Sequence, residues 1–186
     1  MTLKKADFEK SIAEICGLIE KNNNFLILTH EKPDGDAIGS QLAMSIALRK
    51  MGKTVVSPTE KAPEQYQELP HFEILTPAED YKMTTKPEVC IVLDSSNFER
   101  TPIGALPEGI LIINIDHHAD NTYFGGVNYA NPNSAATGIS VYHILSKLGM
   151  EIDREIAENL FAAIITDTGR SFSMLMPVSK PYSASR

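Results

Sequence analysis

Three short runs of almost uninterrupted apolar residues constrain the fold of this chain more than any other feature. They occupy residues 25–29, 89–94 and 110–115, and loops or segments of helical periodicity separate them. Runs of this length and composition are typical of strands buried on both faces of a parallel sheet. The chain has 186 residues, 42% of them hydrophobic, which suffices for one domain with a substantial core.

The remaining segments have patterns that favour helices and loops. Five prolines in residues 57–87 predict a loop-rich connection with at most short helices, and residues 125–133 read as a loop rich in glycine and asparagine. Strands that alternate with helices predict an α/β fold, with a mostly parallel sheet and helices on both faces. Helices are expected at residues 6–22, 37–51, 135–148 and 153–166, and a further strand at 53–56.

The charge balance excludes one class of partner. Lys and Arg number 17 against 24 Asp and Glu, which gives a formal net charge of −7. A broad basic face that grips duplex nucleic acid is therefore not expected, whereas bound cations would allow a small phosphate substrate. The N-terminus is polar and no apolar run approaches the length of a membrane span, so we expect a soluble, cytoplasmic protein without a membrane partner. Cys16 and Cys90 lie in apolar runs and are expected to be buried free thiols.

Ionisable side chains follow three of the predicted strands and the last predicted helix. Because ligands of such folds bind beyond the carboxyl ends of the strands, these side chains are expected to converge at one edge of the sheet. Five carboxylates packed together would repel one another unless cations intervened. Mixed histidine and carboxylate ligands suit Mn²⁺, Zn²⁺ or Fe²⁺ better than Ca²⁺. The candidates are His30, Asp34, Asp36, Asp94, Asp116, His117 and Asp167.

Each of these motifs also has a purely structural interpretation. Asp34 and Asp36 are typical of a turn followed by a helix N-cap, and Asp94 with the two serines after it is typical of a capped loop. Residues 116–118 are harder to explain in this way, because three ionisable groups directly after an apolar strand are costly without a function. Taken together, the motifs predict a metal site.

The order of the motifs resembles that of the DHH phosphoesterase superfamily. The order is His-x-x-x-Asp-x-Asp, a strand ending in Asp, then Asp-His-His, then Thr-Asp-Thr-Gly at residues 166–169. Residues 30–40 and 131–138 resemble in particular the branch of bifunctional oligoribonucleases and PAP phosphatases. The resemblance covers residues 5 to 170 and implies a DHH domain over residues 1–170.

The resemblance implies two divalent cations, usually Mn²⁺, at the edge of the sheet. Neighbouring carboxylates on one turn, such as those of Asp34 and Asp36, can each face a different ion. The implied ligands are His30, Asp34 and Asp94 for one ion, and Asp36, Asp94, His117 and Asp167 for the other, with Asp94 bridging.

It also implies roles for residues that are not metal ligands. His118 would contact the substrate phosphate or protonate the leaving oxygen, and Asp116 would orient a histidine or backbone group. Ser95, Ser134 and Thr137 could donate hydrogen bonds to phosphate oxygens, although roles as helix caps or turn residues are equally compatible with the sequence.

The implied activity is hydrolysis of short oligoribonucleotides and of 3′-phosphoadenosine 5′-phosphate (pAp). Pyrophosphatase or cyclic-dinucleotide phosphodiesterase activity is the alternative within the same superfamily. A third possibility is a fragment that binds metal but does not turn over substrate, because positioning and exclusion of water contribute much of the rate.

The C-terminal segment departs from the family pattern. Members of this branch continue into a second, substrate-binding domain, and its Gly-Gly-Gly-His type of motif does not occur here. Residues 171–185, back-translated and read two nucleotides out of frame, permit codons for a family-like continuation. We therefore expect residues 171–186 to be an aberrant tail produced by a frameshift. Loss of the second domain would reduce activity and expose apolar surface that leads to self-association.

Overall fold

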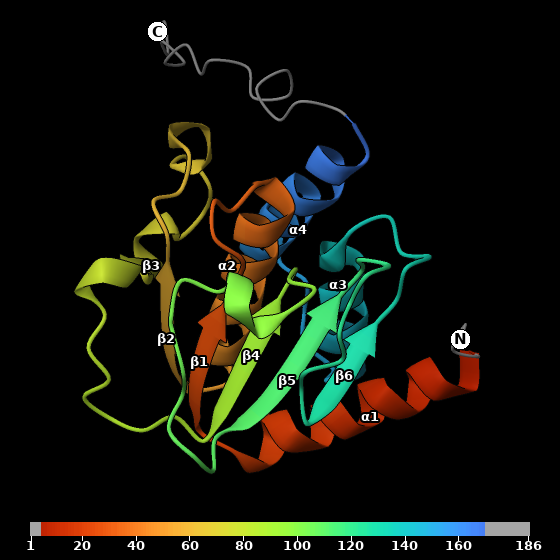
Figure 1. Cartoon of the computed structure of the whole chain (residues 1–186). Helices are drawn as coiled ribbons and strands as arrows, with labels where there is room; N and C mark the ends of the chain where they lie inside the picture. The colour runs from red at the N-terminus through yellow and green to blue at the C-terminus, as the bar shows by residue number, and fades with distance from the viewer. Residues whose placement is uncertain (1–4, 170–186) are drawn as a thin grey trace, which may run out of the picture.

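The computed structural model describes residues 5–169, with side chains from residue 8 onward, and contains a six-stranded sheet (Figure 1). The strand order is β3-β2-β1-β4-β5-β6, and each neighbouring pair is parallel. The predicted α/β fold with a parallel sheet is thereby confirmed. The strands are β1 (Asn24–Leu28), β2 (Thr54–Thr59), β3 (Leu75–Pro77), β4 (Val89–Leu93), β5 (Leu111–Asp116) and β6 (Val127–Ala130).

The helices begin and end within a few residues of their predicted positions. None of the helices in residues 5–169 is long and apolar enough to span a bilayer. The expected aberrant tail, residues 171–186, lies outside the described residues. The α-helices are α1 (Lys5–Lys21), α2 (Gly35–Lys50), α3 (Thr137–Lys147) and α4 (Arg154–Asp167), and the short 3-10 helices are η1 (Glu64–Tyr66), η2 (Phe72–Ile74), η3 (Ala78–Asp80) and η4 (Phe98–Arg100).

The two short strands β3 and β6 correct the sequence prediction. Residues 57–87 were expected to contain only loops and short helices, and residues 125–133 only a loop. Three residues of β3 pair with β2, and the four residues of β6 pair with β5. Such short segments have no readable periodicity, and pairing with a neighbouring strand stabilises them.

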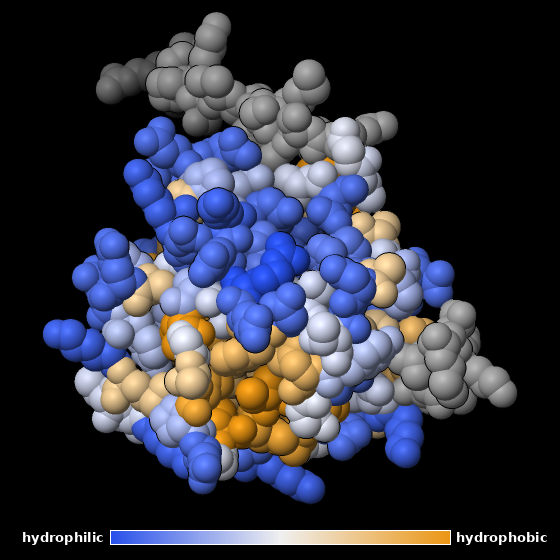
Figure 2. Space-filling model, viewed as in Figure 1, coloured by the Kyte–Doolittle hydropathy of each residue, from blue (hydrophilic) through white to orange (hydrophobic). Residues whose placement is uncertain are grey.

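The layers on the sheet correct a second expectation, that helices would cover both faces. All four α-helices contribute to one apolar cluster on one face, together with side chains such as Ile27, Ile91 and Ile113. On the other face, Leu28 and Val92 pack against loop and η4 side chains, and no α-helix of the described residues contributes. Figure 2 shows apolar surface over the lower part of the sheet, on the side away from α2, α3 and α4.

The handedness of the crossovers explains this arrangement. The chain moves from β1 to β2 in one direction along the sheet, and from β4 to β5 to β6 in the other. Because parallel crossovers are right-handed, the two sets of connections lie on opposite faces. The first contains α2, whereas residues 94–110 and 117–126 contain η4 as their only helix. Loops therefore cover the second face.

The close packing of α2 against α4 requires glycine at position 39. A Cβ atom there would lie 2.4 Å from the Asn159 carbonyl oxygen and 2.8 Å from the Ala163 backbone nitrogen. Backbone atoms cannot rotate away, so the helices would have to separate. Because α4 carries Asp167 at its C-terminus, the same contact sets the distance of that carboxylate from the rest of the site.

Gly39→Ala is therefore expected to lower the free energy of unfolding by about 1–3 kcal/mol, the usual cost of overpacking a core. Chemical denaturation measures the change. Gly17→Ala on α1 is the matched control, since nothing lies within 4 Å of the added methyl group. The control should be more stable than the native protein by about 0.4–1 kcal/mol. Equal stability of the Gly39 and Gly17 variants would contradict the packing argument.

Candidate metal centre

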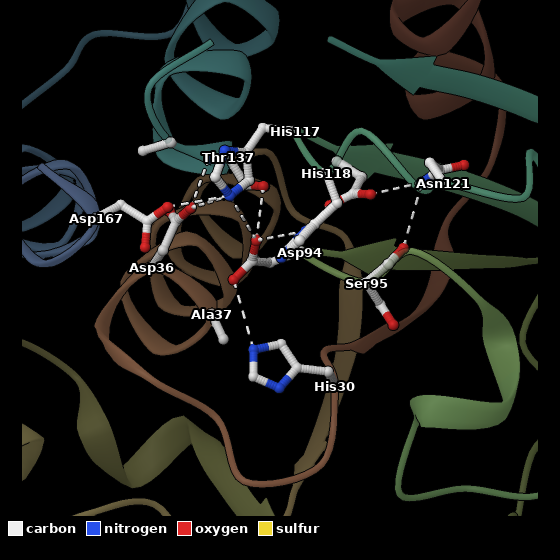
Figure 3. A network of polar contacts seen from close by, with 12 residues as sticks. His30, Asp36, Ala37, Asp94, Ser95, His117, His118, Asn121, Thr137 and Asp167 are labelled. Carbon is white, nitrogen blue, oxygen red and sulfur yellow. Dashed lines mark hydrogen bonds and ion pairs between the residues drawn. The ribbon is translucent and has the colours of Figure 1, made fainter. Parts of the chain in front are cut away.

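The ionisable residues singled out from the sequence lie together at the carboxyl edge of the sheet (Figure 3). Three groups of side chains have possible ligand atoms within 4.8 Å of one another, and the first two coincide with ligands implied by the resemblance. No Lys or Arg within residues 8–169 forms an ion pair with any of these carboxylates. The groups are His30, Asp34 and Asp94; Asp36, His117 and Asp167; and Asp94, His117 and His118.

Asp94 occupies the centre of the arrangement. It follows β4 directly, its side chain is buried, and its φ of 54° is in the left-handed region, where Asp is tolerated better than most residues. The Nε2 atoms of His30 and His117 lie 3.6 and 3.5 Å from its two carboxylate oxygens, Oδ2 and Oδ1 respectively. The two imidazoles thus approach one carboxylate from opposite sides (Figure 3).

Hydrogen bonds at Nδ1 orient both of these histidines. His30 Nδ1 lies 2.6 Å from the Glu31 carbonyl oxygen, and His117 Nδ1 lies 3.4 Å from the Ser134 carbonyl oxygen. A carbonyl oxygen only accepts hydrogen bonds, so Nδ1 is the donor in both contacts, and Nε2 is the ring nitrogen available to a cation. Metal-binding histidines are typically oriented in this way. The donor set therefore fits divalent cations that accept nitrogen and oxygen ligands.

Asp36 connects the site to the N-terminus of α3. Its two carboxylate oxygens accept hydrogen bonds from the backbone N–H groups of Thr137 (2.6 Å) and Gly138 (2.9 Å). Residue 136, at the N-cap position of α3, makes no side-chain cap, so Asp36 supplies this function from 100 residues away in the chain. Burial raises the pKa of Asp36 to about 8, and the charge of Asp94 also raises it. The two backbone hydrogen bonds lower the pKa but do not outweigh these effects. A nearby cation would restore the carboxylate.

Asp34 and Asp167 complete the two groups from the ends of helices. Asp34 is the N-cap of α2 and accepts hydrogen bonds from the backbone N–H groups of Asp36 and Ala37, both at 3.1 Å. The structural interpretation of this residue is thus correct, and its carboxylate also lies near the candidate ligands. Asp167 Oδ2 lies 3.0 Å from His117 Nε2, and burial raises the pKa of Asp167 despite the opposing charge of that histidine.

His118 and Asp116 form a separate pair beside the metal ligands. His118 Nδ1 lies 2.7 Å from Asp116 Oδ1, and this hydrogen bond raises the pKa of His118 to about 9. Burial opposes ionisation of Asp116, but hydrogen bonds from His118 and Asn121 outweigh it and lower the pKa of this carboxyl group. His118 is therefore protonated at neutral pH in the metal-free protein, and it could supply a proton.

The amides that support this pair were missed in the sequence. Asn121 donates from Nδ2 to Asp116 Oδ2 (2.6 Å) and lies 2.7 Å from Asn114 Oδ1. Asn114 in turn donates to the Ser95 carbonyl oxygen (3.1 Å). Asn114 could have been identified from the sequence, because it is a lone amide side chain within an apolar strand. Asn121 lies in a loop, where Asn is common and carries no such signal.

Replacing Asp116 by asparagine should lower the pKa of His118 from about 9 toward its usual value of 6.5, because the charged acceptor is lost. NMR titration of the His118 ring in metal-free protein measures this change. Asp120→Asn is the control, since Asp120 is exposed and outside the cluster. An unchanged titration of His118 in the Asp116 variant would show that the hydrogen bond does not control its protonation.

The three hydroxyl groups predicted to contact substrate all donate hydrogen bonds within the protein. Ser95 Oγ donates to the Asn97 carbonyl oxygen and Ser134 Oγ to the Ala136 carbonyl oxygen, both at 2.8 Å. Thr137 Oγ1 donates to Asp94 Oδ1 at 3.0 Å and so holds the central carboxylate. The geometry of the two serines is that of turn residues, and a role in substrate binding remains a prediction for all three.

Comparison with known proteins agrees with this arrangement of residues. Residues 24–164 match the DHH family, N-terminal domain. The chain is 35% identical over 165 residues to the bifunctional oligoribonuclease and PAP phosphatase NrnA of Thermus thermophilus, an alignment that covers 85% of this chain and 47% of that protein. It is 26% identical to a protein of Enterococcus faecalis named "Probable manganese-dependent inorganic pyrophosphatase", over 78% of this chain and 48% of that one.

A solved structure gives the same result. The crystal structure of an exopolyphosphatase-related protein from Bacteroides fragilis superposes with a TM-score of 0.79 at 25% identity, over 87% of this chain and 51% of that one. The chain thus spans about half the length of the relatives that it matches. Because the family match extends over most of the sequence, the protein belongs to the DHH family, and residues 24–164 correspond to the N-terminal domain of that family.

Proposed function

We propose that this protein is a two-metal phosphoesterase that hydrolyses short oligoribonucleotides and pAp. The observation that carries the proposal is the buried Asp94 carboxylate, which lies between the Nε2 atoms of His30 and His117 and belongs to two candidate metal groups. The name of the Thermus thermophilus relative supports this substrate class. A formal net charge of −7 agrees with a substrate of a few nucleotides held mainly at the metal centre.

The residues that would hold the cations divide into two sets around Asp94. His30 and Asp34 lie on one side, and Asp36, His117 and Asp167 on the other. Two divalent cations, when bound, neutralise the non-bridging oxygens of a phosphoester and make a water molecule more acidic. We propose Mn²⁺ as these cations, because mixed imidazole and carboxylate ligands suit it and because the name of the Enterococcus faecalis relative includes manganese.

His118 would act as the proton donor to the leaving oxygen. Its side chain is about one-third exposed, and Asp116 keeps it protonated and fixes its orientation. Asn121 holds the far oxygen of Asp116 and so acts as a positioning residue. The ring lies close to Asp94, with Nδ1 3.8 Å from Asp94 Oδ1, and because Nδ1 is bound to Asp116, Nε2 would donate the proton.

The substrate is tested by a panel of phosphate compounds in the presence of Mn²⁺. The proposal expects hydrolysis of a 5′-labelled RNA dinucleotide and of pAp, abolished by a chelator and restored by Mn²⁺. Pyrophosphate and a cyclic dinucleotide test the alternative activities, the first of which the name of the Enterococcus faecalis relative favours. Faster hydrolysis of pyrophosphate than of either nucleotide would replace the proposed substrate with this alternative.

The same experiment tests whether this chain turns over substrate efficiently. Relatives are about twice as long, and we expect reduced turnover without further substrate-binding residues. Binding of two Mn²⁺ ions without hydrolysis would identify an inactive metal-binding domain. The expected self-association remains a prediction, which light scattering over a range of concentrations can test, and so does a cytoplasmic location.

A further inference from the structure

A cavity of about 640 Å³ opens beside the metal centre, at the carboxyl ends of β2 and β3. Its size is within the range of small-molecule sites. Glu31, which follows the candidate ligand His30, forms part of its wall, and Thr59 at the end of β2 forms another. Because β1 and β2 are adjacent parallel strands, the cavity lies roughly one or two strand spacings of about 4.8 Å from His30.

Thr59 gives the cavity a polar group without a partner. The residue is 5% exposed, and its hydroxyl group makes no hydrogen bond within the described residues. A buried hydroxyl group without a partner is costly, so such groups are rare unless a ligand or water satisfies them. Phe72 and Leu75 are among the apolar residues that line the same cavity.

The charges of the lining exclude an anionic group and favour hydrogen-bond donors. Glu31, Glu60 and Glu79 line the cavity, with Lys61 as the single cation among the lining residues. Glu60 accepts a hydrogen bond from the backbone N–H of Lys32, whereas the carboxylates of Glu31 and Glu79 accept none within the described residues. These carboxylates do not belong to any of the candidate metal groups. The ligand they suit is neutral and carries N–H groups.

We propose that this cavity binds the nucleobase of a nucleotide whose phosphate lies at the metal centre, with a preference for bases that carry an exocyclic amino group. The proposal rests on the proposed function for the position of the phosphate. A base is flat and largely apolar on its faces, and it carries N–H groups at its edge. The cavity offers apolar contacts for the faces and hydrogen-bond acceptors for the edge. Phe72 offers a ring for stacking, and the glutamates offer acceptors for an amino group.

Nucleoside binding to metal-free protein tests the cavity alone. Adenosine, added to the full chain in a chelator, should shift the backbone amide NMR signals of Thr59, Lys61 and Thr76. Inosine, which presents a carbonyl oxygen in place of the amino group of adenosine, should bind roughly tenfold more weakly. Equal affinity for the two nucleosides, or adenosine shifts confined to residues outside the cavity, would overturn the proposal.

Thr59→Val provides a variant that separates binding from folding. Valine has the same shape and removes a buried unsatisfied hydroxyl group, so the variant should be at least as stable as the native protein. Its affinity for adenosine should nevertheless fall by about two- to tenfold. Glu79→Gln should reduce the preference for adenosine over inosine, and Glu68→Gln, an exposed control outside the lining, should not. Unchanged adenosine binding in both Thr59→Val and Glu79→Gln would rule the cavity out.

Hydrolysis of bis-p-nitrophenyl phosphate distinguishes failure of this proposal from failure of the proposed function. This diester contains no nucleobase, so its Mn²⁺-dependent hydrolysis by the native chain depends on the metal centre alone. Hydrolysis without adenosine binding would contradict the proposed nucleobase site but support the proposed phosphoesterase activity. Adenosine binding at the cavity without hydrolysis of any phosphoester would retain the nucleobase site and remove the proposed function.

Discussion

Asp94→Asn should lower metal-dependent phosphoester hydrolysis by at least about a thousandfold while the protein remains folded. The Asp94 carboxylate lies between His30 and His117, so loss of its charge weakens both candidate metal groups at once. Stabilisation of transition-state charge by bound cations contributes several kcal/mol, and each 1.36 kcal/mol corresponds to a tenfold change in rate.

Asparagine suits this test better than alanine. It keeps the size of the side chain, accepts the hydrogen bond from Thr137 Oγ1 and tolerates the left-handed backbone conformation at this position. Asp120→Asn, an exposed carboxylate nearby, is the matched control and should retain native rates. Rates are measured with bis-p-nitrophenyl phosphate at saturating Mn²⁺, and circular dichroism reports the fold. A folded Asp94 variant within about tenfold of the native rate would exclude Asp94 as an essential ligand.

The stability of the metal-free protein should fall as the pH rises from about 4 to about 8. The pKa of Asp36 is about 8 in the folded protein against an ordinary value of 3.8, so the folded state binds more protons than the unfolded state across this range. Stability therefore decreases with rising pH. Asp167 and His118, whose pKa values are also raised, act in the same direction. The expected decrease in Tm between pH 5 and pH 8 is about 5 °C or more.

Mn²⁺ should reverse this trend. Cations bind the ionised carboxylates of the folded state, and saturation at about 100 times the dissociation constant adds about 2.7 kcal/mol. The increase in Tm on adding Mn²⁺ should thus be larger at pH 8 than at pH 5. Thermal melts in a chelator and in Mn²⁺ measure both effects, and Asp36→Asn should flatten the metal-free pH dependence. A metal-free protein that gains stability from pH 5 to pH 8 would contradict the assigned cause.

The sequence specified the centre of the sheet better than its edges. β1 and β4 are buried along almost their whole length, and a strand in that environment must be apolar at nearly every position. β6 reads Val-Asn-Tyr-Ala and contains an asparagine in the middle, so composition alone does not distinguish it from a loop. That loops and not α-helices cover the second face follows from the direction of the crossovers, which depends on strand order and not on local pattern.

The candidate site likewise contains residues that the sequence predicts and contacts that it does not. Residues that end a predicted strand, such as Asp94, converge because parallel strands end at one edge of the sheet. Asp36 caps α3 from a distant segment of the chain, and Asn121 supports Asp116 from an irregular loop. No spacing rule predicts either contact. The cavity beside β2 depends on a proline-rich loop, whose path the sequence leaves open.

The order of the ligands along the chain has a consequence for biosynthesis. The first group is complete once residue 94 has been made, and it needs only β1, β4 and the start of α2 to be in place. The second group is complete only when His117 and Asp167, the last residue of the last described helix, have been synthesised. Because chains emerge from the ribosome in sequence, the first of the two proposed ions could be held on a nascent chain, whereas the second could be held only after nearly the whole domain has been synthesised.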